Sequence, residues 1–162
     1  MKKNRIHFTC LLAIAVFILS SCSSDDDKDT TKPLIENVEP HDGDTLKIGG
    51  KIHFEANLSD NDLLASYAID IHDATGHTHT KSTSAIIDSV HFSFKKIWTD
   101  VAGKKNVTVH HHEIEIPVVD GAGKPIKEGK YHFIIQCLDQ SGNQATLSRN
   151  VVLSHQGGDI DH

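Results

Sequence analysis

The sequence predicts an all-β protein, an antiparallel β-sandwich of about seven strands. Short runs in which apolar and polar residues alternate recur along the chain. No long stretch shows the apolar period of about 3.6 residues that marks an amphipathic helix. Groups of Gly, Asp, Asn and Pro separate the alternating runs, as they do between the strands of antiparallel sheets.

Three predicted strands lie in the first half of the domain. They cover residues 33–38, 51–58 and 64–72. A turn at 40–44 and the Gly49-Gly50 pair lie between the first two of these strands. In the third strand Ile69 and Ile71 point to one face, so His72 points to the other.

Four predicted strands follow in the second half. They cover residues 89–98, 107–116, 128–139 and 144–153. The apolar Val109 is odd-numbered whereas Ile114 is even-numbered, and this change of phase predicts a bulge within the triple histidine 110–112. Together the strands indicate an immunoglobulin-like sandwich over residues 33–154, in which the third strand pairs with the penultimate one. We expect residues 155–162 to form a flexible tail.

The first 21 residues have the organisation of a lipoprotein signal peptide. Three basic residues precede an apolar run at 8–19 that is too short to span a bilayer comfortably. The segment Leu19-Ser20-Ser21-Cys22 resembles a bacterial lipobox, in which the cysteine is lipidated and becomes the new N-terminus. We therefore expect Cys22 to carry the lipid. Residues 22–32 are acidic and lack apolar side chains, so we expect a flexible tether after the lipidated cysteine.

The serine–aspartate run that follows Cys22 predicts where the protein is located. It resembles the export signal by which Bacteroidetes send lipoproteins to the outer face of the outer membrane. We therefore expect an outer-membrane lipoprotein that is exposed at the cell surface. Its contact with the membrane would be made by the N-terminal lipid.

The charge and the cysteines exclude some classes of protein. After removal of the first 21 residues, the chain keeps 13 basic against 22 acidic side chains, a formal charge of −9. An acidic chain of this kind lacks the clustered Lys and Arg that bind phosphates, so we expect no nucleic-acid partner. Cys137 is then alone beside the lipidated cysteine, and its apolar strand predicts a buried thiol.

Histidine is the residue type that suggests a function. Twelve of the 13 histidines remain after removal of the signal peptide. His72, His77 and His79 fall within eight positions, and residues two apart on a strand share a face. Imidazole nitrogen binds zinc, copper and nickel. We therefore predict that these three histidines bind a divalent transition metal.

A fourth ligand would come from a distant segment of the chain. His132 is predicted to point outward from the penultimate strand, on the same sheet face as His72. His110 and His112 lie two apart and are the other candidates, and the sequence leaves this choice open. Asp70 and Asp73 are candidate partners that would orient a ligating imidazole through its other nitrogen.

Other functions compete with the metal site. The main alternative is a non-catalytic adhesion or accessory module that binds either a glycan or an outer-membrane partner protein. The residues at 60–62 and Asp139 offer oxygen ligands for calcium, but their turn-forming role is the simpler explanation, so we expect no calcium. No nucleophile elbow and no acid–base pair is recognisable, and we expect no enzymatic activity.

Three segments, together with the lipobox, resemble a known family. These segments are His72/His77/His79, Tyr131-His132-Phe133 and Asp139-Gln140-Ser141-Gly142-Asn143. On these residues the chain resembles a Bacteroidetes lipoprotein family catalogued as domain of unknown function 4625. The resemblance covers nearly all of the chain after the signal peptide. It implies an immunoglobulin-like or cadherin-like sandwich in the cell envelope, and it implies no particular activity.

Overall fold

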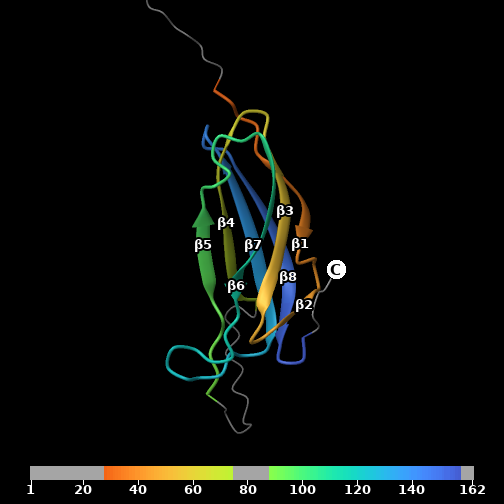
Figure 1. The fold of residues 1–162 in the computed structure, drawn as a ribbon, viewed down its shortest axis with the longest axis vertical. Helices are drawn as coiled ribbons and strands as arrows, with labels where there is room; N and C mark the ends of the chain where they lie inside the picture. Colours follow the sequence, from red (N-terminus) through yellow and green to blue (C-terminus); the bar gives the residue numbers. More distant parts are fainter. Residues whose placement is uncertain (1–27, 75–87, 158–162) are drawn as a thin grey trace, which may run out of the picture.

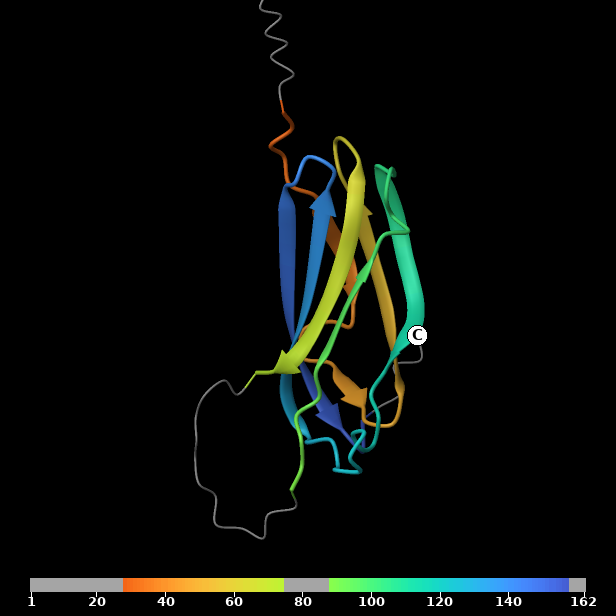
Figure 2. The same cartoon turned by 90° about the vertical axis from the view of Figure 1, so that its left-hand side faces the viewer.

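The structure is a computed structural model that describes residues 28–74 and 88–157. In this part of the chain there is no helix, and eight strands form two sheets (Figure 1, Figure 2). The strands are β1 (Leu34–Glu39), β2 (Thr45–Lys47), β3 (Lys51–Ser59), β4 (Leu64–Asp73), β5 (Phe94–Trp98), β6 (Asn106–Glu115), β7 (Gly129–Asp139) and β8 (Gln144–Ser154). Among the described residues no helix could cross a membrane.

The two sheets confirm the predicted sandwich. One sheet has the order β1-β3-β6 and the other the order β2-β8-β7-β4-β5. All neighbouring strands are antiparallel except β2 and β8, which are parallel. The third predicted strand, now β4, pairs with the penultimate strand β7 as expected. This pairing, with the β7–β8 hairpin beside it, is the arrangement typical of immunoglobulin-like domains.

The core lies between the sheets and is built by residues that alternate along the strands. In β3 every second residue from Ile52 to Leu58 is buried, and β7 shows the same alternation from Tyr131 to Cys137. Phe54 lies between the rings of Tyr67 and Phe133, at centroid distances of 6.1 Å from each. Residues between these positions point outward, because successive strand residues face opposite sides of a sheet.

Cys137 is fully buried with a free thiol, as predicted. Burial raises the pKa of this thiol to about 11. A thiol that stays protonated is a poor nucleophile and a poor metal ligand. Cys137 therefore serves packing, and the metal-binding potential of the domain depends on other side chains.

Two elements differ from the prediction. The short strand β2 was not predicted, because three residues with a single buried side chain, Leu46, show no alternation that could be recognised. The predicted strand 89–98 is regular only from Phe94 onward. Its earlier part makes an isolated bridge at Val90, and Phe92 in this part is buried.

Candidate metal centre

The predicted bulge in the triple histidine is present and decides where each imidazole points. Ile52 pairs with Ile114 and Phe54 pairs with His111, so two steps along β3 correspond to three along β6. The bulge therefore lies between His111 and Ile114. It lets both of these residues face the core although one is odd-numbered and the other even-numbered.

His111 is the inward member of the triple histidine. Its ring stacks on Trp98 at a centroid distance of 4.9 Å and also contacts Phe54 at 5.1 Å. Burial lowers the pKa of this imidazole, which favours the neutral form. His110 and His112 point the other way and are exposed on the outer face of the three-stranded sheet.

A third histidine meets His110 and His112 on this outer face. His53 lies between the buried residues Ile52 and Phe54 of β3, so its side chain points outward. The His53 ring lies 4.9 Å from the ring of His110 and 4.8 Å from that of His112, centroid to centroid. One ligand nitrogen from each of the three histidines lies within 4.8 Å of the others. We call these three residues the histidine cluster.

The closest contact of the cluster joins His53 Nδ1 and His112 Nε2, which are 3.0 Å apart. Zinc–nitrogen bonds of about 2.0–2.1 Å in a tetrahedral site place neighbouring nitrogens about 3.3 Å apart. Two ligand atoms are therefore already near the separation that a metal requires. The His110 ring, 5.2 Å from His112, is exposed and can turn toward the same point.

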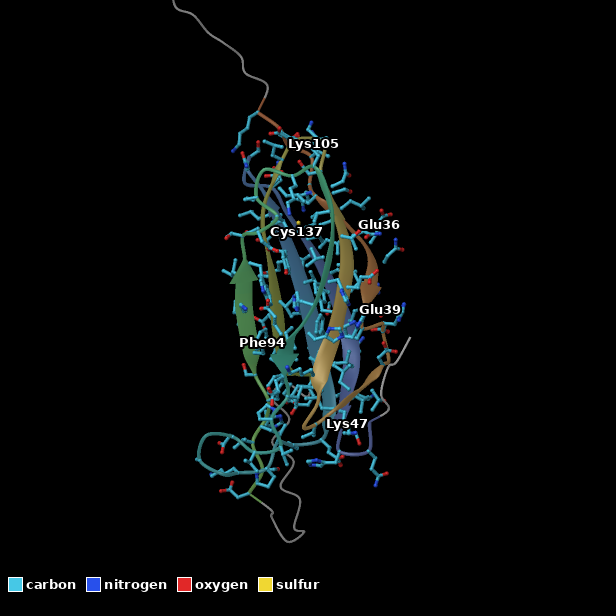
Figure 3. The ribbon with its side chains drawn as sticks, viewed as in Figure 1. Glu36, Glu39, Lys47, Phe94, Lys105 and Cys137 are labelled. Carbon is cyan, nitrogen blue, oxygen red and sulfur yellow. The ribbon has the colours of Figure 1, made fainter. Side chains whose placement is uncertain are left out.

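A carboxylate holds the other side of the His53 ring. His53 Nε2 lies 3.3 Å from Oε2 of Glu39, the last residue of β1 (Figure 3). A carboxylate on the distal nitrogen fixes the tautomer of a ligating imidazole and raises its basicity. With the proton on Nε2, His53 presents the lone pair of Nδ1 toward His112.

A second bulge brings Glu39 to this position. Glu36 pairs with Asn57 and Glu39 pairs with Glu55, so β1 also carries one extra residue relative to β3. Asn37, inside this bulge, has a φ of 48°. Asn tolerates the left-handed region better than most residues do. Bulges on both neighbours of β3 thus place Glu39 on one side of His53 and His112 on the other.

The structure separates the predicted site residues into two groups. His72 and His132 are brought together on the five-stranded sheet, with ring centroids 5.6 Å apart. His110 and His112 belong to the other sheet. Both pairs point outward, and the outer faces of a sandwich point in opposite directions. His110 and His112 are therefore not placed where they could complete a site with His72.

The predicted partners of His72 lie near it. Asp70 Oδ1 lies 2.7 Å from His72 Nδ1, which is the orienting contact expected of Asp70. Asp73 Oδ1 lies 3.1 Å from Nδ1 of His91. His72, Asp73 and His91 line a hollow of about 550 Å³ between β4, β7 and the segment before β5. Its lining residues are His72, Asp73, Ala74, His91, Phe92, Ser93 and His132. His77, His79 and Cys22 lie outside the described residues.

His53 and Glu39 were missed at the level of the sequence. The alternation of Ile52 and Phe54 already places His53 on the outer face of its strand. The missing information was that this strand pairs with the one that carries the triple histidine. For Glu39 no sequence signal was available, since its position depends on the bulge at Asn37.

The fold and the site together define an immunoglobulin-like β-sandwich with a histidine cluster on the outer face of its smaller sheet. The profile of one family matches residues 20–154. The chain belongs to this family, which is described as Domain of unknown function (DUF4625), as its sequence motifs predicted. No curated protein matches the chain. Family membership thus supplies no activity, and the function has to be inferred from the site.

Proposed function

We propose that the protein binds a divalent transition metal, zinc, copper or nickel, through His53, His110 and His112. The main support for this proposal is a pair of contacts made by His53, one with Glu39 and one with His112. It combines a carboxylate-oriented imidazole with a second imidazole nitrogen at close range, which is a recurrent arrangement in metal sites. Since the cluster is open to solvent, water would supply the remaining ligand.

The hydrogen bond between His53 and His112 indicates which protonation state of these imidazoles would bind a metal. Without metal, His112 Nε2–H donates to the lone pair of His53 Nδ1, because Glu39 holds the proton of His53 on Nε2. To bind a metal through Nε2, His112 would adopt the other neutral tautomer, in which its single proton lies on Nδ1 and Nε2 offers a lone pair. Binding therefore requires neutral imidazoles, and metal affinity falls as the pH is lowered.

The test is titration calorimetry with zinc, copper(II) and nickel on the protein purified without a histidine tag. His53→Ala and His112→Ala are expected to weaken binding by at least about tenfold. His155→Ala is the matched control, because His155 is another exposed histidine, in the turn after β8. Binding that is unchanged in His53→Ala and lost in His72→Ala would assign the metal to the His72–His132 pair and refute the cluster.

We also propose that the domain is a non-catalytic, lipid-anchored protein of the outer membrane, exposed at the cell surface. The lipobox and the acidic run after Cys22 support this location. In this setting the metal site would serve capture, buffering or delivery of the ion. Metabolic labelling with a radioactive fatty acid tests the anchor, since Cys22→Ala should abolish incorporation of the label.

The second candidate function is recognition of a partner protein of the outer membrane or of a glycan. Strand β5 favours a protein partner, because it forms the edge of the five-stranded sheet and exposes 62% of Ile97. A glycan platform on Trp98 has less support, since Tyr67 stacks on this ring at 5.0 Å and Lys96 lies 4.8 Å from its centre. Partner capture that persists in the presence of a chelator would favour this second function.

A further inference from the structure

Three aspartates meet at the end of the sandwich where the tether enters. Asp29 precedes β1, Asp60 follows β3, and Asp139 is the last residue of β7. One carboxylate oxygen from each lies within 4.8 Å of the others. The three segments are far apart in the sequence, and no turn of the chain requires their carboxylates to converge.

One member of this group is deeply buried. Asp139 exposes 1% of its surface and is the only buried charged residue in the described part of the chain. Both of its oxygens accept hydrogen bonds from Asn143, one from the backbone N–H and one from the side-chain amide, each at 2.7 Å. These neutral donors orient the carboxylate but leave its negative charge without a cation.

The other two aspartates have oxygens with no partner. Oδ1 of Asp29 accepts the backbone N–H of Thr31, and Oδ1 of Asp60 accepts that of Asp62, both at 2.9 Å. Oδ2 of Asp29 and Oδ2 of Asp60 are shielded from solvent and accept no hydrogen bond from the described residues. Turn formation explains the two Oδ1 atoms, but it does not explain two shielded, unpaired anionic oxygens.

Within the described ranges, no basic side chain compensates this charge. None of the three aspartates forms a salt bridge there. Lys105 lies at the same end (Figure 3), and its ammonium group donates to the backbone oxygen of Asn61 at 2.7 Å. The backbone N–H of Thr31 and the amide of Asn61 lower the pKa of Asp29, so this carboxylate is ionised at neutral pH.

Contrary to the expectation from the sequence, which assigned Asp60 and Asp139 to turn formation, we propose that Asp29, Asp60 and Asp139 bind a calcium ion. Calcium prefers oxygen ligands at about 2.3–2.6 Å, so ligands on opposite sides of the ion lie about 4.6–5.2 Å apart. The spacing of the three carboxylates lies within this limit. Water completes the coordination shell, and Asn143 keeps Asp139 aimed at the ion. This site differs from the histidine cluster in its ligand atoms and in its place on the domain.

The calcium site joins the tether to the sandwich. Asp29 belongs to the segment before β1, and the side-chain amide of Asn143 already donates to its backbone oxygen at 2.9 Å. A calcium ion adds a bond from the same residue to β7 and to the β3–β4 loop. Calcium therefore fixes the point at which the chain leaves the domain toward its N-terminus.

The experiment measures calcium binding and thermal unfolding of the full chain, first treated with a chelator. Addition of calcium is expected to raise the melting midpoint and to give a saturable calorimetric signal. Asp29→Asn and Asp60→Asn should each weaken calcium binding by about tenfold or more, because each removes a charged ligand. Asp62→Asn, in the same loop as Asp60, is the matched control and should bind calcium as the parent protein does.

Melting in the absence of calcium gives a second measurement, which distinguishes calcium binding from a purely structural role of the three aspartates. Without calcium, Asp60→Asn should melt at the same temperature as the parent protein or higher, because it relieves repulsion among the carboxylates. With calcium it should melt lower than the parent protein. Absence of calcium binding at millimolar concentrations, or binding that survives in both Asp29→Asn and Asp60→Asn, would overturn the proposal. His53→Ala should leave calcium binding unchanged, so this test is independent of the transition-metal site.

Discussion

Glu39 is the residue on which the geometry of the histidine cluster depends most. Its carboxylate contacts His53 Nε2 and so leaves Nδ1 of the same ring available for a metal. Without this contact the imidazole could present either nitrogen and several orientations. In the proposed metal site Glu39 would therefore position a ligand, and the histidines would hold the metal itself.

Glu39→Gln should weaken zinc binding by about 10–100-fold without preventing folding, because the amide can still contact His53 but no longer raises its basicity. Titration calorimetry measures this loss. Glu36→Gln, an exposed position on the same strand (Figure 3), is the control and should bind zinc with unchanged affinity. Equal affinities for Glu39→Gln and Glu36→Gln would show that the carboxylate has no part in the site.

The two buried tyrosines provide a contrast at the same scale. Tyr131 Oη donates to the backbone oxygen of Lys127 at 2.8 Å and accepts the N–H of Phe92 at 3.2 Å. Tyr67 Oη is buried and has no hydrogen-bond partner among the described residues. Burial raises the pKa of both phenols. The two hydroxyl groups should therefore contribute to stability with opposite signs.

Tyr131→Phe should lower the free energy of unfolding by about 1–2 kcal/mol, because it leaves two backbone groups without their partner. Tyr67→Phe should leave it unchanged or raise it by about 1 kcal/mol, since the substitution removes an unpaired polar group. Denaturant unfolding of both variants checks the difference. A large loss of stability in Tyr67→Phe would mean that a water bridges this hydroxyl to the protein.

At the scale of the elements, the bulges on both sides of β3 create the candidate site. The bulge in β6 directs His112 outward, and the bulge in β1 brings Glu39 beside His53. This use of bulges to redirect side chains is common next to functional sites.

Asn37→Val should disturb both stability and metal binding, because a β-branched residue is strained at a φ of 48°. We expect a loss of about 1–2 kcal/mol in the free energy of unfolding, together with weaker zinc binding as Glu39 moves. Asn37→Gly is the matched variant and should retain both properties. Chemical denaturation and calorimetry on the pair check the prediction. Normal zinc affinity in a destabilised Asn37→Val variant would show that metal binding does not depend on the bulge at Asn37.

The elements also show what the sequence could predict. Alternation of buried and exposed residues identified seven strands, their inward faces and the bulge among the histidines, because each of these is a local property of the chain. The pairing of β3 with β6 is a long-range property, and therefore His53 was not joined to His110 and His112. The converging aspartates were missed for the same reason, since Asp29 and Asp139 lie 110 positions apart.

At the scale of the whole molecule, several carboxylates connect the strands to the loops. Asp42 accepts the backbone N–H of Asn150 in β8, and Glu128 accepts that of His155. These hydrogen bonds lower the pKa of both carboxyl groups. A folded-state pKa below the unfolded value means that the contribution to stability is present above the unfolded pKa. It is lost as the pH falls through the folded pKa.

The thermal midpoint should therefore decrease modestly below about pH 6.5, because His111 takes up a proton more readily in the unfolded chain than in the folded one, and should decrease further below about pH 4, where carboxyl groups begin to protonate. Asp42→Asn should lower the midpoint at pH 7 and make the loss toward pH 3 shallower, because one of the titrating groups is gone. Calorimetric scans at several pH values in the presence of a chelator measure both effects. A midpoint that rises on acidification would contradict this assignment.

The arrangement of β7 has a consequence for how the domain stands on a surface. Asp139 ends this strand beside the point where the tether enters, while His132 lies near its other end. The seven steps from His132 to Asp139 span about 23 Å, so the proposed lipid anchor would attach to the end of the domain opposite the hollow around His132. If the domain stands on a membrane in this way, a molecule diffusing in from the medium would meet the imidazoles first and the three aspartates only afterwards.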